Sequence, residues 1–143
     1  MSQKNLNHEK NNIIYLFNQK KFDKISKISS KILDQFNEEI EIVKIVVISY
    51  LNQKNYFKAE QYLKNSLSKL NSAELNYFLG NTLKIQDKNL EAINAYKKSI
   101  SLKSDYSEAY NNLANVQKKI GMLDEASSNY LNAINCKKDN IEA

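Results

Sequence analysis

The sequence predicts an all-α fold, an α-solenoid of stacked helix pairs, and three observations lead to this prediction. The stretch Ala73–Asn140 is one 34-residue unit written twice without a gap, and a fixed period of this length is typical of repeat architectures. The 143 residues include no proline and only two glycines, which disfavours strands and β-turns. Apolar residues recur at helical spacing within each unit.

The two copies in Ala73–Asn140 match at positions that define a helix pair. Extending the same frame toward the N-terminus predicts a unit over 40–72, one residue short, and a degenerate unit over 6–39. The units 73–106 and 107–140 complete a single array. Leu79, Asn81, Glu91, Ala92, Tyr96 and Ile100 recur in the next copy as Leu113, Asn115, Glu125, Ala126, Tyr130 and Ile134.

The first two units carry apolar residues that predict their helices. In 40–72, the run Ile40–Leu51 is much shorter than the roughly 20 residues that span a bilayer, so it predicts a buried helix. In 6–39, we expect Ile13, Leu16 and Phe17 in the first helix and Phe22, Ile25, Ile28 and Ile32 in the second.

Turn residues mark the helix ends of the last two units. In 107–140 the first helix should run from about Tyr106 to Ile120 and stop at Gly121, the natural left-handed residue past a helix end. The second should begin near Leu123. Lys20, Lys54 and Asp87 stand at the corresponding place in the other units, where they are tolerated less well than glycine.

Acidic residues predict two helix starts. Asp105 followed by Glu108 resembles a capping box at the start of the fourth unit. Asp139 and Glu142 repeat this signal one full repeat later, so we expect 141–143 to open a truncated further unit.

Small and large residues alternate where two helices must approach closely. Gly80 and Ala114 are the small residues of the first helices, and Ala92 and Ala126 those of the second. Tyr96 and its counterpart one unit later are predicted to fill the space beside them.

The segments LGNTL–EAINAY (Leu79 to Tyr96) and NLANVQ–DEASSNY (Asn112 to Tyr130) resemble the tetratricopeptide repeat family. They share its Leu–small pair, its alanine at the start of the second helix and its aromatic four residues later. The family's early aromatic is Asn76 here, and its unit-ending proline is absent. The resemblance implies a right-handed superhelix whose concave groove is lined by the first helix of each unit.

The resemblance also implies which side chains line this groove. Asparagine dominates its second half, and an asparagine amide can pair with a peptide bond of any sequence because it has both a donor and an acceptor. The alternative is that asparagine is simply common throughout this chain. The predicted peptide-binding residues are Lys44, Tyr77, Phe78, Asn81, Lys84, Asn111, Asn112, Asn115 and Lys118.

A carboxylate clamp, the family subtype that holds acidic C-termini, is not predicted. It needs lysine and asparagine at matched places in three successive units. Lys10 fits in the first unit, but Ile14 and Ile45 occupy asparagine places and Glu74 stands where a lysine is needed.

The sequence does not predict an enzyme, a cofactor or a metal site. The single His8 and the single Cys136 supply neither a metal set nor a nucleophile with a neighbouring base. The net charge of +5 comes from lysine alone, and without arginine it argues only weakly for nucleic acid. Nothing resembles a signal peptide, so we expect a cytoplasmic protein.

Three interpretations therefore follow from the sequence. The first is a non-catalytic scaffold that binds an extended or helical peptide segment of a partner protein. The second is the N-terminal docking region of a longer enzyme of glycosyltransferase, sulfotransferase or oxygenase type. The third, nucleic-acid binding, is the least favoured. An uncapped last helix should also leave Tyr130, Ile134 and Cys136 partly exposed and favour weak self-association.

Overall fold

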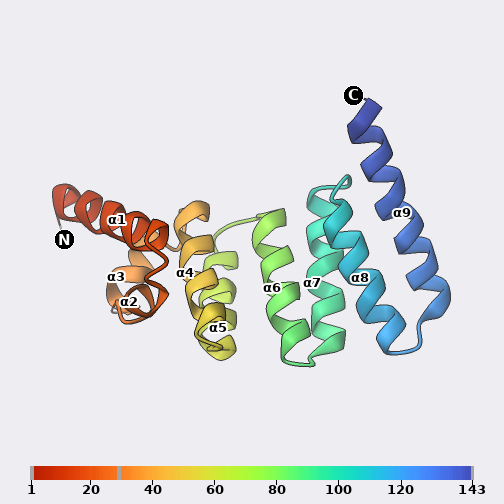
Figure 1. The fold of residues 1–143 in the computed structure, drawn as a ribbon, viewed down its shortest axis with the longest axis horizontal. Coiled ribbons are helices and arrows are strands. Elements are labelled where there is room, and N and C mark those ends of the chain that lie inside the picture. Colours follow the sequence, from red (N-terminus) through yellow and green to blue (C-terminus); the bar gives the residue numbers. More distant parts are fainter. Residues whose placement is uncertain (1, 29, 143) are drawn as a thin grey trace. The chain divides into compact units, whose positions relative to one another are not determined.

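The computed structural model describes residues 2–28 and 30–142, and the regular secondary structure within them is entirely helical. The chain forms two compact units, Met1–Leu70 and Asn71–Ala143. In the second unit, successive helices run in opposite directions and are joined by short turns (Figure 1). None of the described helices combines the length and the apolar character needed to cross a bilayer.

The first unit is built around a strongly apolar helix. Helix α4 buries Val43 and Val46 completely, which confirms the buried helix predicted from its sequence. Ile13 and Leu16 are the buried residues of the first helix of the chain. The elements of this unit are α1 (Gln3–Asn18), α2 (Phe22–Ser26), α3 (Ser30–Leu33), the 3-10 helix η1 (Asp34–Phe36), α4 (Ile40–Asn52) and α5 (Tyr56–Leu67).

The second helix predicted for residues 6–39 is not continuous, and in this respect the prediction was wrong. Helix α2 ends at Ser26, and Ile28 lies outside the helices. The Ser26 hydroxyl donates to the carbonyl of Asp23, the kind of local bond by which serine competes with the helix ladder. The chain turns again at η1, where the carbonyl of Leu33 accepts a 2.7 Å hydrogen bond from the Tyr62 hydroxyl.

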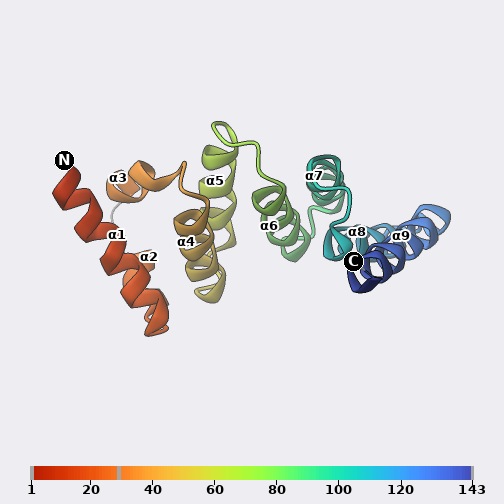
Figure 2. The same cartoon turned by 90° about the horizontal axis from the view of Figure 1, so that it is seen from above.

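The second unit consists of two helix pairs that share one core. Its elements are α6 (Ala73–Ile85), α7 (Asn89–Leu102), α8 (Ser107–Lys119) and α9 (Leu123–Glu142). Both views place α9 along α8 (Figures 1 and 2). The core cluster comprises Leu83, Ala92, Ile93, Ala95, Tyr96, Leu113 and Val116.

The close approach of α6 and α7 confirms the predicted pairing of small and large residues. Tyr96 is completely buried, and its ring lies against Gly80. A Cβ atom added to Gly80 would lie 2.5 Å from Cε1 of that ring. Ala92 is also fully buried.

The turn inside each helix pair has one left-handed residue at the predicted place. The φ angles are 53° at Lys20, 54° at Lys54, 60° at Asp87 and 84° at Gly121. In each case the next residue donates its N–H to a carbonyl five residues back, as Met122 does to Gln117. This pattern is the Schellman motif, which satisfies the last carbonyls of the first helix.

The acidic cap predicted at Asp105 for helix α8 does not form. Helix α8 has Tyr106 as its N-cap residue, without a side-chain hydrogen bond. Instead, the backbone carbonyl of Asp105 accepts a hydrogen bond from the N–H of Ser107. Helix α9 extends through Asp139 to Glu142, and the further unit expected from 141–143 stays a prediction. Ala143 lies outside the described residues.

Candidate functional site

The predicted groove residues of the second unit lie on neighbouring first helices, α6 and α8. Within each helix they follow the spacing i, i+1, i+4 and i+7, which keeps the side chains on one face. Asn112 of α8 joins this face to α6, because its Nδ2 donates to Oδ1 of Asn81 at 2.9 Å and to the Tyr77 hydroxyl at 3.1 Å. We call this surface the α6–α8 face; it comprises Tyr77, Phe78, Asn81, Lys84, Asn111, Asn112, Asn115 and Lys118.

Two tyrosines of the second helices orient the asparagines of this face. The Tyr96 hydroxyl donates to Oδ1 of Asn81 at 2.7 Å, and the Tyr130 hydroxyl donates to Oδ1 of Asn115 at 2.6 Å. The same bond therefore occurs at equivalent places in two successive repeats. Because each Oδ1 accepts from a tyrosine, the tyrosine fixes which end of the amide faces its own helix pair.

Asn81 and Asn112 leave complementary atoms without partners. Among the described residues, the Nδ2 group of Asn81 donates to no acceptor and Oδ1 of Asn112 accepts from no donor. Both atoms are accessible to solvent. Within the described part of the chain, the side-chain atom that is both buried and without a partner is Oδ1 of Asn89. The pair thus offers one donor and one acceptor side by side.

Tyr77 has a structural role as well as the predicted binding role. Its ring centroid lies 5.0 Å from that of Tyr106, 6.1 Å from that of Tyr96 and 6.2 Å from that of Phe78. Burial, followed by the neighbouring Tyr77, raises the pKa of Tyr106 to about 12. Sequence reasoning missed Tyr106, which lies at the junction of two units, where the repeat pattern marks no binding position.

The predicted lysines differ in their surroundings. Lys118 is exposed and Lys84 is half-buried, and neither has an ion-pair partner among the described residues. Lys44 belongs to α4 of the first unit, where its ammonium group lies 3.1 Å from the carboxylate of Glu41. Lys10 of α1 pairs with Glu39. The site described here is therefore confined to the second unit.

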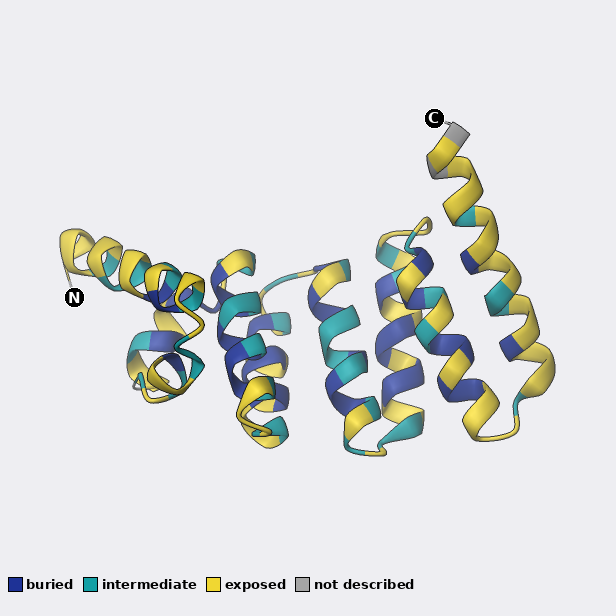
Figure 3. Cartoon of the chain, viewed as in Figure 1, coloured by how far each residue is buried: buried dark blue, intermediate teal, exposed yellow. Residues whose placement is uncertain are grey.

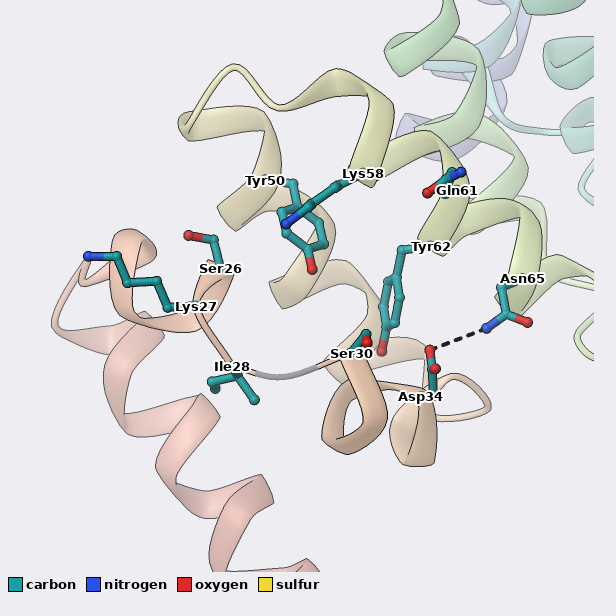
Figure 4. A pocket seen from close by; sticks show the side chains of 10 residues that line it. All are labelled: Ser26, Lys27, Ile28, Ser30, Asp34, Tyr50, Lys58, Gln61, Tyr62 and Asn65. Atoms are coloured by element: carbon teal, nitrogen blue, oxygen red, sulfur yellow. Dashed lines mark hydrogen bonds between the residues drawn. The ribbon is translucent and has the colours of Figure 1, made fainter.

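The structure also contains a cleft in the first unit that sequence reasoning missed. It has a volume of about 640 Å³ and lies beside the break between α2 and α3. Figure 4 shows Lys27 at one end and Asp34 with Asn65 at the other, with Tyr50 and Tyr62 between them. The repeat pattern predicted a continuous second helix here, so it held no signal for a cleft.

The candidate catalytic and metal-binding residues remain scattered. Among the described residues, no three His, Cys, Asp or Glu side chains gather as a metal site would require. His8 is exposed on α1. Cys136 is partly exposed with its Sγ 3.7 Å from the Ser104 carbonyl, and burial followed by Asp105 raises its thiol pKa. A raised pKa disfavours the reactive thiolate.

Known protein families and structures match the chain as follows. A model described as TPR repeat matches residues 80–121, and one described as tetratricopeptide repeat matches residues 107–140. No curated protein matches the sequence closely.

Solved structures share the fold over most of the chain. A crystal structure of MamA is 26% identical over 87% of this chain and 73% of that chain, with a TM-score of 0.78. MamA from Desulfovibrio magneticus RS-1 is 16% identical over 89% of this chain and 72% of that chain, with a TM-score of 0.78. YrrB is described as a TPR protein with an unusual peptide-binding site. It is 19% identical over 88% of this chain and 66% of that chain, with a TM-score of 0.74.

Period, turn geometry and the Tyr96–Gly80 contact agree with these matches. The residues matched by the family models run from the middle of α6 to near the end of α9. Residues 80–140 of this chain are therefore tetratricopeptide repeats.

Proposed function

We propose that this chain is a non-catalytic cytoplasmic scaffold that holds an extended peptide segment of a partner protein on the α6–α8 face. The observation that carries the proposal is the pair of unpartnered atoms on Asn81 and Asn112. The amide donor of Asn81 matches the carbonyl of a peptide bond, and the amide oxygen of Asn112 matches a peptide N–H. Such a pair binds backbone irrespective of the peptide sequence.

The backbone-directed amides favour an extended peptide over a helical one. In a helix, the N–H and C=O groups of the interior already bond one another along the chain. They offer little to asparagines on a neighbouring surface. An extended segment leaves these groups free, and its alternate side chains point to opposite sides.

Sequence preference would come from the aromatic and charged residues around the asparagines. Phe78 and Tyr77 are partly exposed and supply apolar contact. Lys84 and Lys118 lack ion-pair partners among the described residues, so an acidic side chain of the peptide would be attracted to them. YrrB has the same fold and a peptide-binding site, which supports a peptide as the ligand class.

The alternative role, the docking region of a longer enzyme, keeps the sequence evidence that suggested it, which is the LGN…EA pattern and the acidic pair Asp139 and Glu142. The nucleic-acid alternative has no support from arginine, which the chain lacks.

The test uses aspartate in place of Asn81 and Asn115. An Asn81→Asp, Asn115→Asp variant keeps the oxygens that accept from Tyr96 and Tyr130 and replaces each outward amide donor by a carboxylate oxygen. Peptides are first selected on the wild-type chain from a randomised display library. Binding of a selected peptide, measured by calorimetry, should weaken roughly tenfold or more, as expected for loss of one or two hydrogen bonds.

The matched control is Asn94→Asp, which makes the same chemical change at an exposed position of α7 outside the face. The affinity of this control for the peptide should stay within a factor of about two of the wild-type value, because a remote surface charge is largely screened. In a series of peptides that are each N-methylated at one peptide bond, methylation at one position should abolish binding. Equal affinity of the double variant and the control would show that the asparagines do not contact the peptide.

A further inference from the structure

Helix α9 exposes an unusual amount of apolar side chain. It has 20 residues, whereas α7, the preceding second helix, has 14. Leu123 and Leu131 are each 61% exposed, Ile134 is 50% exposed and Ile141 is 83% exposed. Figure 3 shows most of the helix surface as exposed. Large apolar side chains gathered on one element indicate an interaction surface.

These residues form a stripe that suits packing against another helix. Leu123, Tyr130, Ile134 and Ile141 are separated by seven, four and seven residues, which is the spacing of a coiled-coil seam. Ala126 and Ala133 are buried on the adjoining side of α9, which packs on α8. We call these four residues the α9 stripe.

The internal repeat shows how the corresponding surface is covered one unit earlier. Tyr96 and Ile100 of α7 are the counterparts of Tyr130 and Ile134 in the preceding repeat. Tyr96 is completely buried, and Ile100 packs against the cluster that contains Leu113 of α8. A helix therefore covers on α7 the surface that α9 leaves open.

We propose that the α9 stripe binds the α9 stripe of a second copy of this chain, with the two helices antiparallel. In the register that places Leu123 opposite Ile141, Tyr130 lies opposite Ile134, so apolar residues meet along the whole stripe. The Leu131 side chains flank the stripe close to the twofold axis and approach each other there.

Charge selects the antiparallel arrangement. At 100° per residue, Asp124 and Lys138 flank the stripe on the same side. In the antiparallel register, Lys138 of one copy lies two residues, about 3 Å along the axis, from the position opposite Asp124 of the other. In a parallel pair, the flank that carries Asp124 and Lys138 would face the opposite flank of the partner helix, so this attraction would be lost.

The first helix of another copy is a poorer partner. On α8, Leu113 and Val116 belong to the cluster that covers α7. The corresponding residues of α1 are Asn12 and Tyr15, and both are exposed. A head-to-tail contact of α1 on α9 would therefore cover an apolar stripe with a largely polar surface.

The first experiment measures self-association by sedimentation over a wide concentration range. The wild-type chain should pass from monomer to dimer, whereas Ile134→Asp should remain monomeric at every concentration tested. Leu90→Asp is the matched control, because Leu90 is a 70% exposed residue of α7 outside the stripe. It should dimerise like the wild type. A monomeric wild type, or a dimer that Ile134→Asp leaves intact, would overturn the proposal.

The second experiment tests the antiparallel register by exchanging charges. Asp124→Lys and Lys138→Asp should each weaken the homodimer, because each places like charges within reach. An equimolar mixture of the two variants should form a heterodimer in which both charge pairs are attractive again. If the mixture associates no better than either variant alone, the helices do not pair antiparallel.

Discussion

At the scale of single residues, function depends on which atom of an asparagine faces outward. The repeat period located Asn81 and Asn115 on the first helices. It did not reveal that Tyr96 and Tyr130 occupy their oxygens, because that bond joins two helices whose relative rotation depends on packing. The sequence predicted the positions of the candidate site, and the structure supplied its donor and acceptor arrangement.

A first prediction concerns Gly80. An alanine there should lower the free energy of unfolding by about 1–3 kcal/mol, because its Cβ would overlap the buried ring of Tyr96. Intrinsic helix propensity acts in the opposite direction, favouring alanine by about 1 kcal/mol. The sign of the change in the free energy of unfolding, measured by chemical denaturation, therefore shows which of the two effects is larger. A more stable Gly80→Ala variant would mean that the ring moves aside freely.

At the scale of elements, the turns were more predictable than the helix starts. A left-handed residue is required by backbone geometry alone, so Gly121 and the equivalent Lys54 could be placed from sequence. The start at Asp105 failed because the chain reaches α8 through backbone hydrogen bonds, without using its carboxylate as a cap. The break after Ser26 reflects local serine bonding that the apolar spacing does not reveal.

A second prediction uses these turns as a matched pair. Lys54→Gly should stabilise the protein by about 1 kcal/mol, because it relieves a left-handed conformation that costs a side-chain-bearing residue about 1–2 kcal/mol. Gly121→Ala should destabilise it by a similar amount. No atom lies within 4 Å of a Cβ built on Gly121, so strain in φ is the only new contribution. Thermal unfolding of both variants measures the two shifts, and equal signs would contradict this account.

At the scale of the whole molecule, both compact units bury tyrosines. Burial raises the pKa of Tyr62 in the first unit and of Tyr96 in the second, each with a further contribution from neighbouring groups. The repeat predicted the burial of Tyr96 from its spacing. Tyr62 also lies in a second helix, but its hydrogen bond to Leu33 depends on the break that sequence reasoning missed.

A third prediction follows for alkaline solution. The unfolded chain ionises its tyrosines near their ordinary pKa of 10.0, whereas the folded chain holds several above it. Stability is therefore complete below about pH 10 and falls as the pH rises through the range between the two pKa values. Thermal unfolding midpoints measured from neutral pH to about pH 11 should show this loss.

Tyr106→Phe provides the control for the alkaline transition. The hydroxyl of Tyr106 has no hydrogen-bond partner among the described residues, and its pKa is raised to about 12. Removing the hydroxyl should leave stability at neutral pH nearly unchanged and make the alkaline loss smaller. An identical alkaline slope in both proteins would show that Tyr106 does not contribute to the loss.

The contact between Gly80 and Tyr96 also restricts how this protein can evolve. In the next unit the same two places hold Ala114 and Tyr130, and Tyr130 is less deeply buried. The two copies have therefore diverged to different solutions of one steric problem, and the choice made at one place limits the other. A lineage that replaces Gly80 therefore has two routes: the ring of Tyr96 can move outward, as the less buried Tyr130 suggests, or Tyr96 can give way to a smaller side chain, with the loss of the hydroxyl that orients Asn81.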